Sequence, residues 1–173
     1  KSTRASKARE KGLEPLAESI WAQDRQSGDL LKDAEVYVDP DRGVNTPEEA
    51  LAGACDILAE RIADDPEITD MVRTFTRETG VLTSEAADPD ERTVYDMYYE
   101  YAESISKIPN HRVLAVNRGE KEKKLKIKLK VDIEAVQQRI LSAVVTDEHS
   151  ISRPVLEDTA VDAYKRLMAP SVE

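Results

Sequence analysis

A helix start followed by a long apolar stripe is the feature that most constrains the fold of this chain. Thr46 suits an N-cap, Pro47 suits the first helical turn, and Glu49 stands where a capping box places its acidic residue. Apolar residues then recur at i, i+3, i+4, i+7 and i+11, which is one face of a helix: Leu51, Ala54, Cys55, Leu58 and Ile62. The segment predicts an amphipathic helix.

Similar signals recur along the chain. Asp65-Pro66 and Asp132 are predicted to begin helices, Gly80 stands where a glycine ends one, and Pro170 is predicted to stop the last. We expect about six helices, at residues 15–26, 46–62, 66–79, 94–108, 132–144 and 153–169, and a short extended piece at residues 36–38.

Two short apolar runs interrupt the helical pattern. Residues 113–116 and 125–131 are predicted to be strands that form a hairpin around Gly119. The expected fold is mainly α, a multi-helix domain with one small β-hairpin. Its expected parts are a basic arm or helix end, a helical region, the β-hairpin and C-terminal helices, at residues 1–12, 13–110, 111–131 and 132–173.

Lysines alternate with aliphatic residues in the second predicted strand. Successive side chains of a strand point to opposite faces, so this strand should have one aliphatic face and one cationic face. Lysines on an exposed edge strand often serve only to block aggregation. However, lysines two positions apart lie about 6.6 Å from each other, close to the phosphate spacing of an extended single strand. The candidate nucleic-acid contacts are Arg112, Arg118, Lys124, Lys126, Lys128 and Lys130.

The charge distribution limits which partners fit this chain. Its 173 residues carry a formal net charge of −10, which argues against binding nucleic acid with the whole surface. Residues 1–12 nevertheless hold five basic side chains against Glu10 alone, while residues 29–103 are strongly acidic. Because there is neither an apolar run of about 18 residues nor an N-terminal signal region, we expect a cytoplasmic protein with no membrane partner.

Catalytic and metal-binding motifs are not recognisable in the sequence. His111 and His149 have no HExxH pattern or partner cysteine, and Cys55 lies on an apolar stripe beside an acidic neighbour. We therefore expect no enzyme activity, no metal and no cofactor. The tyrosines of the segment 95–101 allow two interpretations, which are core or interface packing and a platform for stacking bases.

Four segments together resemble a known family. They are GLEPLAESI at 12–20, ALAGACDILAERIADD at 50–65, IPNHRVLAVNRGEKEKKLKIKL at 108–129 and DAYKRLMAPSVE at 162–173. They look like the bacterial Tex proteins, which are transcription accessory factors that bind RNA. Cys55 departs from the pattern, because the family more often has arginine there. The turn after Thr83 also looks shorter and more acidic than is usual.

The resemblance implies that this chain is a fragment of a longer protein. Family members carry further helical sequence before residue 1. After residue 173 they carry an RNase H-like domain of the YqgF type, helix-hairpin-helix elements and an RNA-binding OB-fold. Residues 1–12 would then continue a preceding helix.

Two functions remain open for such a fragment. The first is a non-catalytic helical scaffold that organises the other domains and touches RNA or DNA backbone with its cationic hairpin. The alternative is a protein-binding module, in which acidic helices at residues 46–103 engage a basic partner such as RNA polymerase.

Overall fold

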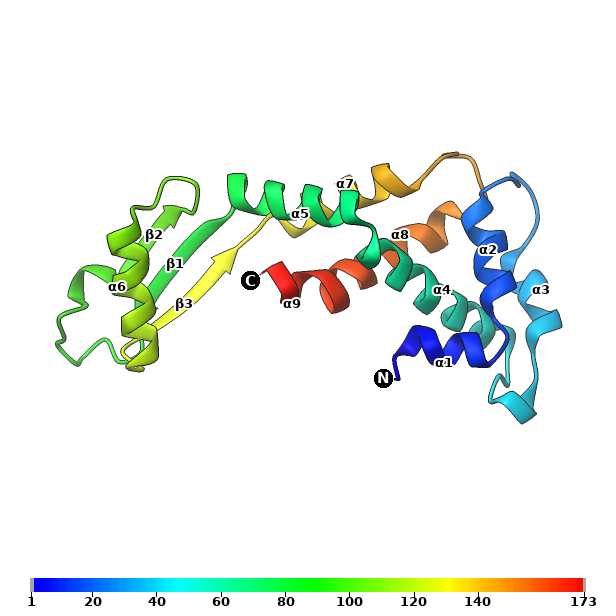
Figure 1. The fold of residues 1–173 in the computed structure, drawn as a ribbon, viewed down its shortest axis with the longest axis horizontal. Coiled ribbons are helices and arrows are strands. Elements are labelled where there is room, and N and C mark those ends of the chain that lie inside the picture. The colour runs from blue at the N-terminus through cyan, green and yellow to red at the C-terminus, as the bar shows by residue number, and fades with distance from the viewer. Residues whose placement is uncertain (1, 173) are drawn as a thin grey trace. The chain divides into compact units, whose positions relative to one another are not determined.

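The computed structural model describes residues 2–172, which are mainly helical (Figure 1). The described chain divides into two compact units. The helical unit comprises residues 2–70 and 137–172, and the sheet unit comprises residues 71–136. The boundaries fall within two helices, α5 (Pro66–Thr79) and α7 (Ile133–Val144).

The helical unit is built around one long helix, α4 (Pro47–Asp64). Its neighbours are α1 (Arg4–Glu10), α2 (Glu14–Ala22), α3 (Leu30–Ala34), α8 (Arg153–Asp162) and the π-helix η4 (Ala163–Met168). Short 3₁₀ turns at η1 (Glu35–Tyr37) and η2 (Pro40–Arg42) link α3 to α4, and α9 (Ala169–Val172) follows η4. Because α4 has neighbours on several sides, its buried residues exceed one stripe and include Ala50, Ala54, Ile57, Leu58, Ala59 and Ile62.

The predicted helix starts are confirmed by side-chain caps. The Thr46 hydroxyl accepts a hydrogen bond from the Glu49 N–H at 3.1 Å, and the Asp65 and Asp132 carboxylates accept bonds in the first turns of α5 and α7. The Glu49 carboxylate accepts from the Asn45 N–H at 2.6 Å, one residue before the position that a capping box predicts. Helix α5 ends at Thr79, directly before Gly80, as predicted.

Residues 1–12 were predicted to be a basic arm or the end of a preceding helix, and Arg4–Glu10 within this segment form the helix α1. Thr3 and Ser6 form a reciprocal capping box at the first turn of α1, which starts at Arg4. Ala5 and Ala8 are buried, and α1 packs against α4. The small apolar and basic residues of this segment therefore form an amphipathic helix with a narrow apolar side.

The sheet unit contains a three-stranded antiparallel sheet covered by one helix (Figure 1). The strands are β1 (Val81–Ala86), β2 (Glu100–Ser104) and β3 (Leu125–Lys130), in the order β2-β1-β3. The 3₁₀ turn η3 (Asp96–Tyr98) precedes β2, and α6 (Asn110–Lys121) precedes β3. A small core joins the helix, the sheet and the turn: Tyr95, Tyr98, Val116 and Leu125.

The predicted hairpin at residues 111–131 is wrong. Residues 113–116 lie within α6, where Val116 is fully buried and Leu114 is exposed. A short apolar run does not distinguish a strand from a buried helix segment, and here helical packing against β3 decides. Strand β3 pairs instead with β1, about 40 residues earlier in the chain.

The predicted helix at residues 94–108 is also wrong. The i, i+3, i+4 spacing of Tyr95, Tyr98 and Tyr99 comes from a 3₁₀ turn, and the chain then extends as β2. Tyrosine favours strands, and the backbone hydrogen bonds to β1 decide the conformation.

Two smaller predictions also differ from the structure. Pro170 lies within α9 and does not stop the last helix at residue 169. The preceding π-helix η4 provides a local change of hydrogen bonding where the proline N–H is missing. Residues 36–38, predicted to be extended, lie mostly in the 3₁₀ turn η1.

Candidate nucleic-acid interface

Strand β3 has the two faces that its sequence predicts. Lys126, Lys128 and Lys130 are exposed, and we call these three side chains the lysine face. Between them, Leu125 is buried and Ile127 and Leu129 are half-buried. Leu125 and Ile127 pack in the core beneath α6, so the lysine face lies on the side of the sheet away from this helix.

The strand register places other side chains beside the lysine face. Directly paired residues of neighbouring strands point to the same side of a sheet. Lys130 is paired with Val81, Lys128 with Thr83 and Lys126 with Glu85. Glu85 is in turn paired with Glu100 of β2. On the open side of the sheet, Lys128 and Lys130 therefore have uncharged neighbours on β1, whereas Lys126 lies beside acidic side chains.

The outer edge of β3 carries backbone groups that β1 does not use. The Ala87 N–H donates to the Lys124 carbonyl at 3.0 Å, which fixes the alternation of the antiparallel ladder. The N–H and C=O groups of residues 126, 128 and 130 consequently point toward β1. Those of Leu125, Ile127 and Leu129 point away from it, and the hydrogen bonds found outside the ladder in residues 2–172 do not involve them. The lysine face thus borders an open sheet edge.

Lys124, the first lysine of the predicted ladder, lies before β3 and has a partner. Its Nζ is 2.6 Å from the Glu91 Oε1, and this hydrogen bond raises the pKa of Lys124 above its ordinary value. Its backbone N–H donates to the Gly119 carbonyl. The side chain therefore joins the loop before β2 to the end of α6 and is not part of the lysine face.

Arg112 and Arg118 are not brought together with the lysine face. Both lie on α6, which packs against the opposite side of the sheet. The Arg112 guanidinium lies 5.7 Å from the centre of the Tyr101 ring, and a hydrogen bond with the Tyr101 hydroxyl raises its pKa. Arg118 is exposed in the last turn of α6. Of the six predicted contact residues, three share one surface.

Two tyrosines of the sheet unit, Tyr95 and Tyr98, are core residues, and Tyr99 and Tyr101 are partly buried against them. Tyr95 and Tyr98 are about 5% exposed, and the Tyr98 and Tyr101 rings meet edge to face at 5.2 Å. The Tyr95 hydroxyl donates to the Glu122 carboxylate, which raises its pKa. Stacking of bases requires exposed ring faces, so the burial of Tyr95 and Tyr98 favours core packing over a stacking platform.

The remaining reactive side chains do not form a centre in the described part of the chain. No cluster of three or more His, Cys, Asp or Glu side chains that would hold a metal is present in residues 2–172. His111 and His149 are exposed, and burial raises the pKa of the half-buried Cys55 thiol. Across the same residues, no helix is both long and apolar enough to cross a membrane.

Glu85, Glu91 and Glu100 shape this surface and were not predicted from the sequence. Their positions depend on pairing between β1, β2 and β3 and on the loop around Glu91. The residues 81–86 show no strict alternation of apolar and polar types, so no local pattern signals β1.

Comparison with known proteins identifies the family. Residues 26–169 match the family model described as Tex central region-like. The chain is 40% identical to the Uncharacterized protein YdcI of Bacillus subtilis, over all of this chain and 24% of that protein. It is 29% identical to the Transcriptional accessory protein Tex of Neisseria gonorrhoeae, over 87% of the chain and 20% of the relative.

The similarity extends to a human protein. The chain is 27% identical to the human S1 RNA-binding domain-containing protein 1, over 98% of the chain and 18% of the relative. It therefore spans about a quarter or less of the length of these three relatives. On the extent of the family match, the chain belongs to the Tex family and covers its central region.

Proposed function

We propose that this chain is a non-catalytic scaffold region of a transcription accessory protein, and that its lysine face binds the phosphate backbone of RNA or DNA. The observation that carries the proposal is the exposed row of Lys126, Lys128 and Lys130 on one side of β3. The names of two relatives, one an accessory protein in transcription and one containing an S1 RNA-binding domain, support nucleic acid as the partner.

The geometry of β3 favours contacts with phosphate over contacts with bases. Lysines at alternate positions lie about 6.6 Å apart and follow one line. Lysine offers a point charge with three donors and no planar surface for stacking. Such contacts position a strand without reading its sequence, and their strength falls steeply with salt.

The scaffold role is supported by the packing of helix α4 and by the state of the Cys55 thiol. Helix α4 is buried by neighbours on several sides and gives the helical unit a rigid centre. A thiol with a raised pKa is a poor nucleophile at neutral pH, which is the state of Cys55.

No specific observation favours the alternative function, an acidic protein-binding module. Part of its predicted helical surface is the strand β2. Several of the carboxylates act within the sheet unit: Glu91 binds Lys124, Asp96 accepts from the Thr93 N–H, and Glu103 accepts from the Tyr101 hydroxyl.

The proposal is tested with the triple variant Lys126→Ala, Lys128→Ala, Lys130→Ala in the full chain. Binding to fluorescein-labelled single-stranded RNA and to duplex DNA is measured by anisotropy over a series of salt concentrations. Three lost phosphate contacts should reduce the dependence of log K on log salt by about 2 to 3. The substitution Arg118→Ala removes a charge from the other side of the sheet and should leave this dependence unchanged.

The outcome that contradicts the proposal is equally clear. If the triple variant binds with the salt dependence of the wild-type chain, the lysine face is a solvated edge and the nucleic acid lies elsewhere. Lack of binding by the wild-type chain at about 50 mM salt would have the same meaning, since three contacts should be measurable there.

A further inference from the structure

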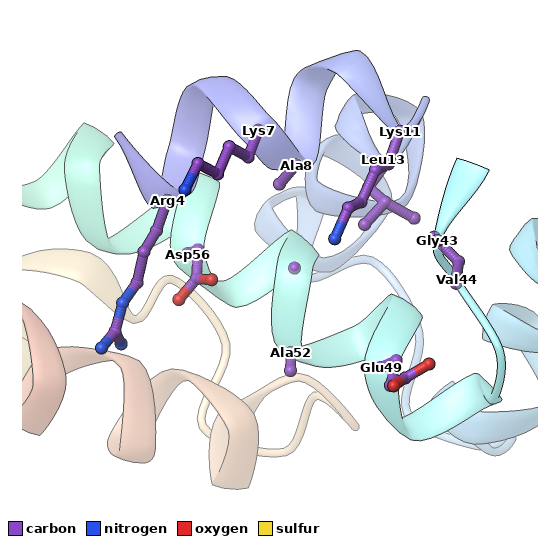
Figure 2. Close-up of a pocket in the computed structure, with 11 residues that line it drawn as sticks. Arg4, Lys7, Ala8, Lys11, Leu13, Gly43, Val44, Glu49, Ala52 and Asp56 are labelled. Atoms are coloured by element: carbon purple, nitrogen blue, oxygen red, sulfur yellow. The ribbon is translucent and has the colours of Figure 1, made fainter. Parts of the chain in front are cut away.

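A groove of about 270 Å³ opens between α1 and α4 in the helical unit, remote in sequence from the lysine face (Figure 2). Arg4 and Lys7 of α1, together with Lys11 at the C-cap of this helix, line one wall. They lie at i, i+3 and i+7 and extend about 10 Å along the helix axis. Within residues 2–172, neither Lys7 nor Lys11 forms an ion pair closer than 4 Å. These two charges are therefore available to a ligand.

The floor of the groove is apolar. It includes Ala8, Leu13, Val44 and Ala52, of which the first three are buried and Ala52 is exposed. Gly53 completes it, and a Cβ at this position would fall inside the Leu13 side chain. The close approach of α4 to Leu13 thus favours glycine at position 53, where a larger residue would displace the Leu13 side chain.

Two carboxylates on α4 also line the groove. Glu49 accepts a hydrogen bond from the Asn45 N–H, and Asp56 lies 3.8 Å from the Arg166 guanidinium. Each keeps further lone pairs for a donor from a ligand. A phosphodiester group offers only acceptors and negative charge toward these carboxylates, whereas a peptide backbone brings an N–H donor at each residue other than proline. The mixed lining therefore favours a peptide over nucleic acid.

We infer that this groove binds an extended acidic peptide segment of a partner protein, with carboxylates at two alternate positions on Lys7 and Lys11 and an apolar side chain between them over Ala52 and Gly53. Lys7 and Lys11 are separated by about 6 Å along α1. Alternate side chains of an extended chain are about 6.6 Å apart, so two carboxylates match the two ammonium groups. The intervening side chain then points away from α1, toward α4.

The size of the groove agrees with this occupant. Sites for whole small molecules typically enclose roughly 300 to 1,000 Å³. A groove of about 270 Å³ accommodates one or two side chains of a peptide that continues beyond both ends. We expect the two peptide carboxylates to fix the position of the peptide along the lysine wall. One aliphatic side chain of the peptide then occupies the floor.

The test uses fluorescein-labelled peptides and the full chain. The probe is Gly-Gly-Glu-Leu-Glu-Gly-Gly, and the matched control replaces both glutamates with glutamine. We expect anisotropy to report binding of the acidic peptide and about tenfold weaker binding of the neutral one. The double variant Lys7→Glu, Lys11→Glu should lose about tenfold in affinity for the acidic probe, while Lys32→Glu on α3 provides the same type of charge reversal outside the groove and should change little.

A second variant separates the groove from general electrostatics. Ala52→Leu fills the floor without changing charge, and leucine is a good helix former at an exposed position. It should weaken binding of the acidic probe at least threefold while the circular dichroism spectrum stays that of the wild type. Equal affinity for both peptides, or unchanged binding in Ala52→Leu, overturns the inference.

Nucleic acid is the remaining alternative occupant. If Lys7→Glu, Lys11→Glu instead abolishes binding of a labelled oligonucleotide and leaves the peptide affinity unchanged, the groove is a phosphate site and the inference is wrong. The lysine-face variants serve as the reference, because they change charges on β3 and leave the residues that line this groove unaltered.

Discussion

Glu85 of β1 and Lys126 of β3 are directly paired across the antiparallel ladder. Their side chains share the open side of the sheet, and Glu100 follows in the same row on β2. The row of lysines on β3 is therefore not uniform. Its Lys126 end lies beside two carboxylates, and its Lys130 end lies beside Val81 and Ser104.

Replacing Glu85 with glutamine should strengthen binding of nucleic acid by the lysine face. The substitution removes a negative charge beside Lys126 and keeps the size of the side chain. We expect about a two- to threefold gain in affinity for single-stranded RNA at low salt, which decreases as salt screens the charges. Anisotropy titrations at several salt concentrations measure it. Glu78→Gln, at an exposed carboxylate on α5, is the control. A loss of affinity in Glu85→Gln would show that phosphate does not approach this row.

Gly119→Ala should destabilise the sheet unit although alanine favours helices. A Cβ at this position of α6 would lie 2.8 Å from the Leu125 Cγ and 3.3 Å from the Tyr95 Cδ1. Moving α6 away from β3 to relieve this overlap should cost about 1 to 3 kcal/mol of the free energy of unfolding. Urea denaturation followed by circular dichroism measures this cost. Asn117→Ala, at an exposed position of the same helix, should be neutral or slightly stabilising.

Gln23→Ala should destabilise the helical unit by about 2 kcal/mol. The Gln23 side chain is 4% exposed and holds the backbone at the end of α7 with two hydrogen bonds. Its Nε2 donates to the Val144 carbonyl at 3.0 Å, and its Oε1 accepts from the Thr146 N–H at 2.9 Å. Alanine would leave both backbone groups without this partner. Gln26→Ala, at an exposed bond to Asp147, should change the stability by less than about 0.5 kcal/mol.

Asp162→Asn should destabilise the protein at neutral pH and have no effect in strong acid. The Arg166 guanidinium donates to the Asp162 carboxylate at 2.8 Å and holds the pKa of Asp162 below its ordinary value of 3.8. A carboxyl group whose pKa is lower in the folded state stabilises the fold above its unfolded pKa, and this contribution is lost as pH falls through the folded pKa. The pair is partly exposed, so the expected loss at pH 7 is at most about 1 kcal/mol.

Urea denaturation of both proteins at several pH values tests this dependence. The difference between wild type and Asp162→Asn should be constant near neutrality and shrink only below pH 3.8. A difference that persists unchanged in strong acid would mean that the pair does not act through charge. Asp158→Asn, at an exposed carboxylate of α8, is the matched control.

Local signals predicted where three of the helices begin. Thr46, Asp65 and Asp132 cap helices because a short polar side chain reaches the first free N–H groups whatever the surrounding fold. The alternation in β3 was equally readable, since it follows from the period of a strand. These features depend on residues within about four positions of each other.

The sheet unit was less predictable because its structure depends on distant partners. Strand β1 lies between β2 and β3 and obtains its backbone hydrogen bonds from residues far along the chain. The tyrosines near residue 98 satisfied a helical spacing that a 3₁₀ turn also produces. The run around Val116 fitted a strand or a helix, and only the packing of α6 on Leu125 distinguishes them. Arg112 and Arg118, which were predicted to extend the cationic surface of the hairpin, consequently lie on α6 instead.

The open edge of β3 should be visible in the rates at which its amide protons exchange with deuterium. The amides of Lys126 and Lys128 face β1, while those of Ile127 and Leu129 face away. Exchange should therefore alternate along the strand, slow at the lysines and fast at the aliphatic residues, in spectra resolved residue by residue. Slowing at Ile127 and Leu129 upon addition of a partner would mean that a backbone has joined the sheet, whereas phosphate held by the lysine ammonium groups would leave the alternation unchanged.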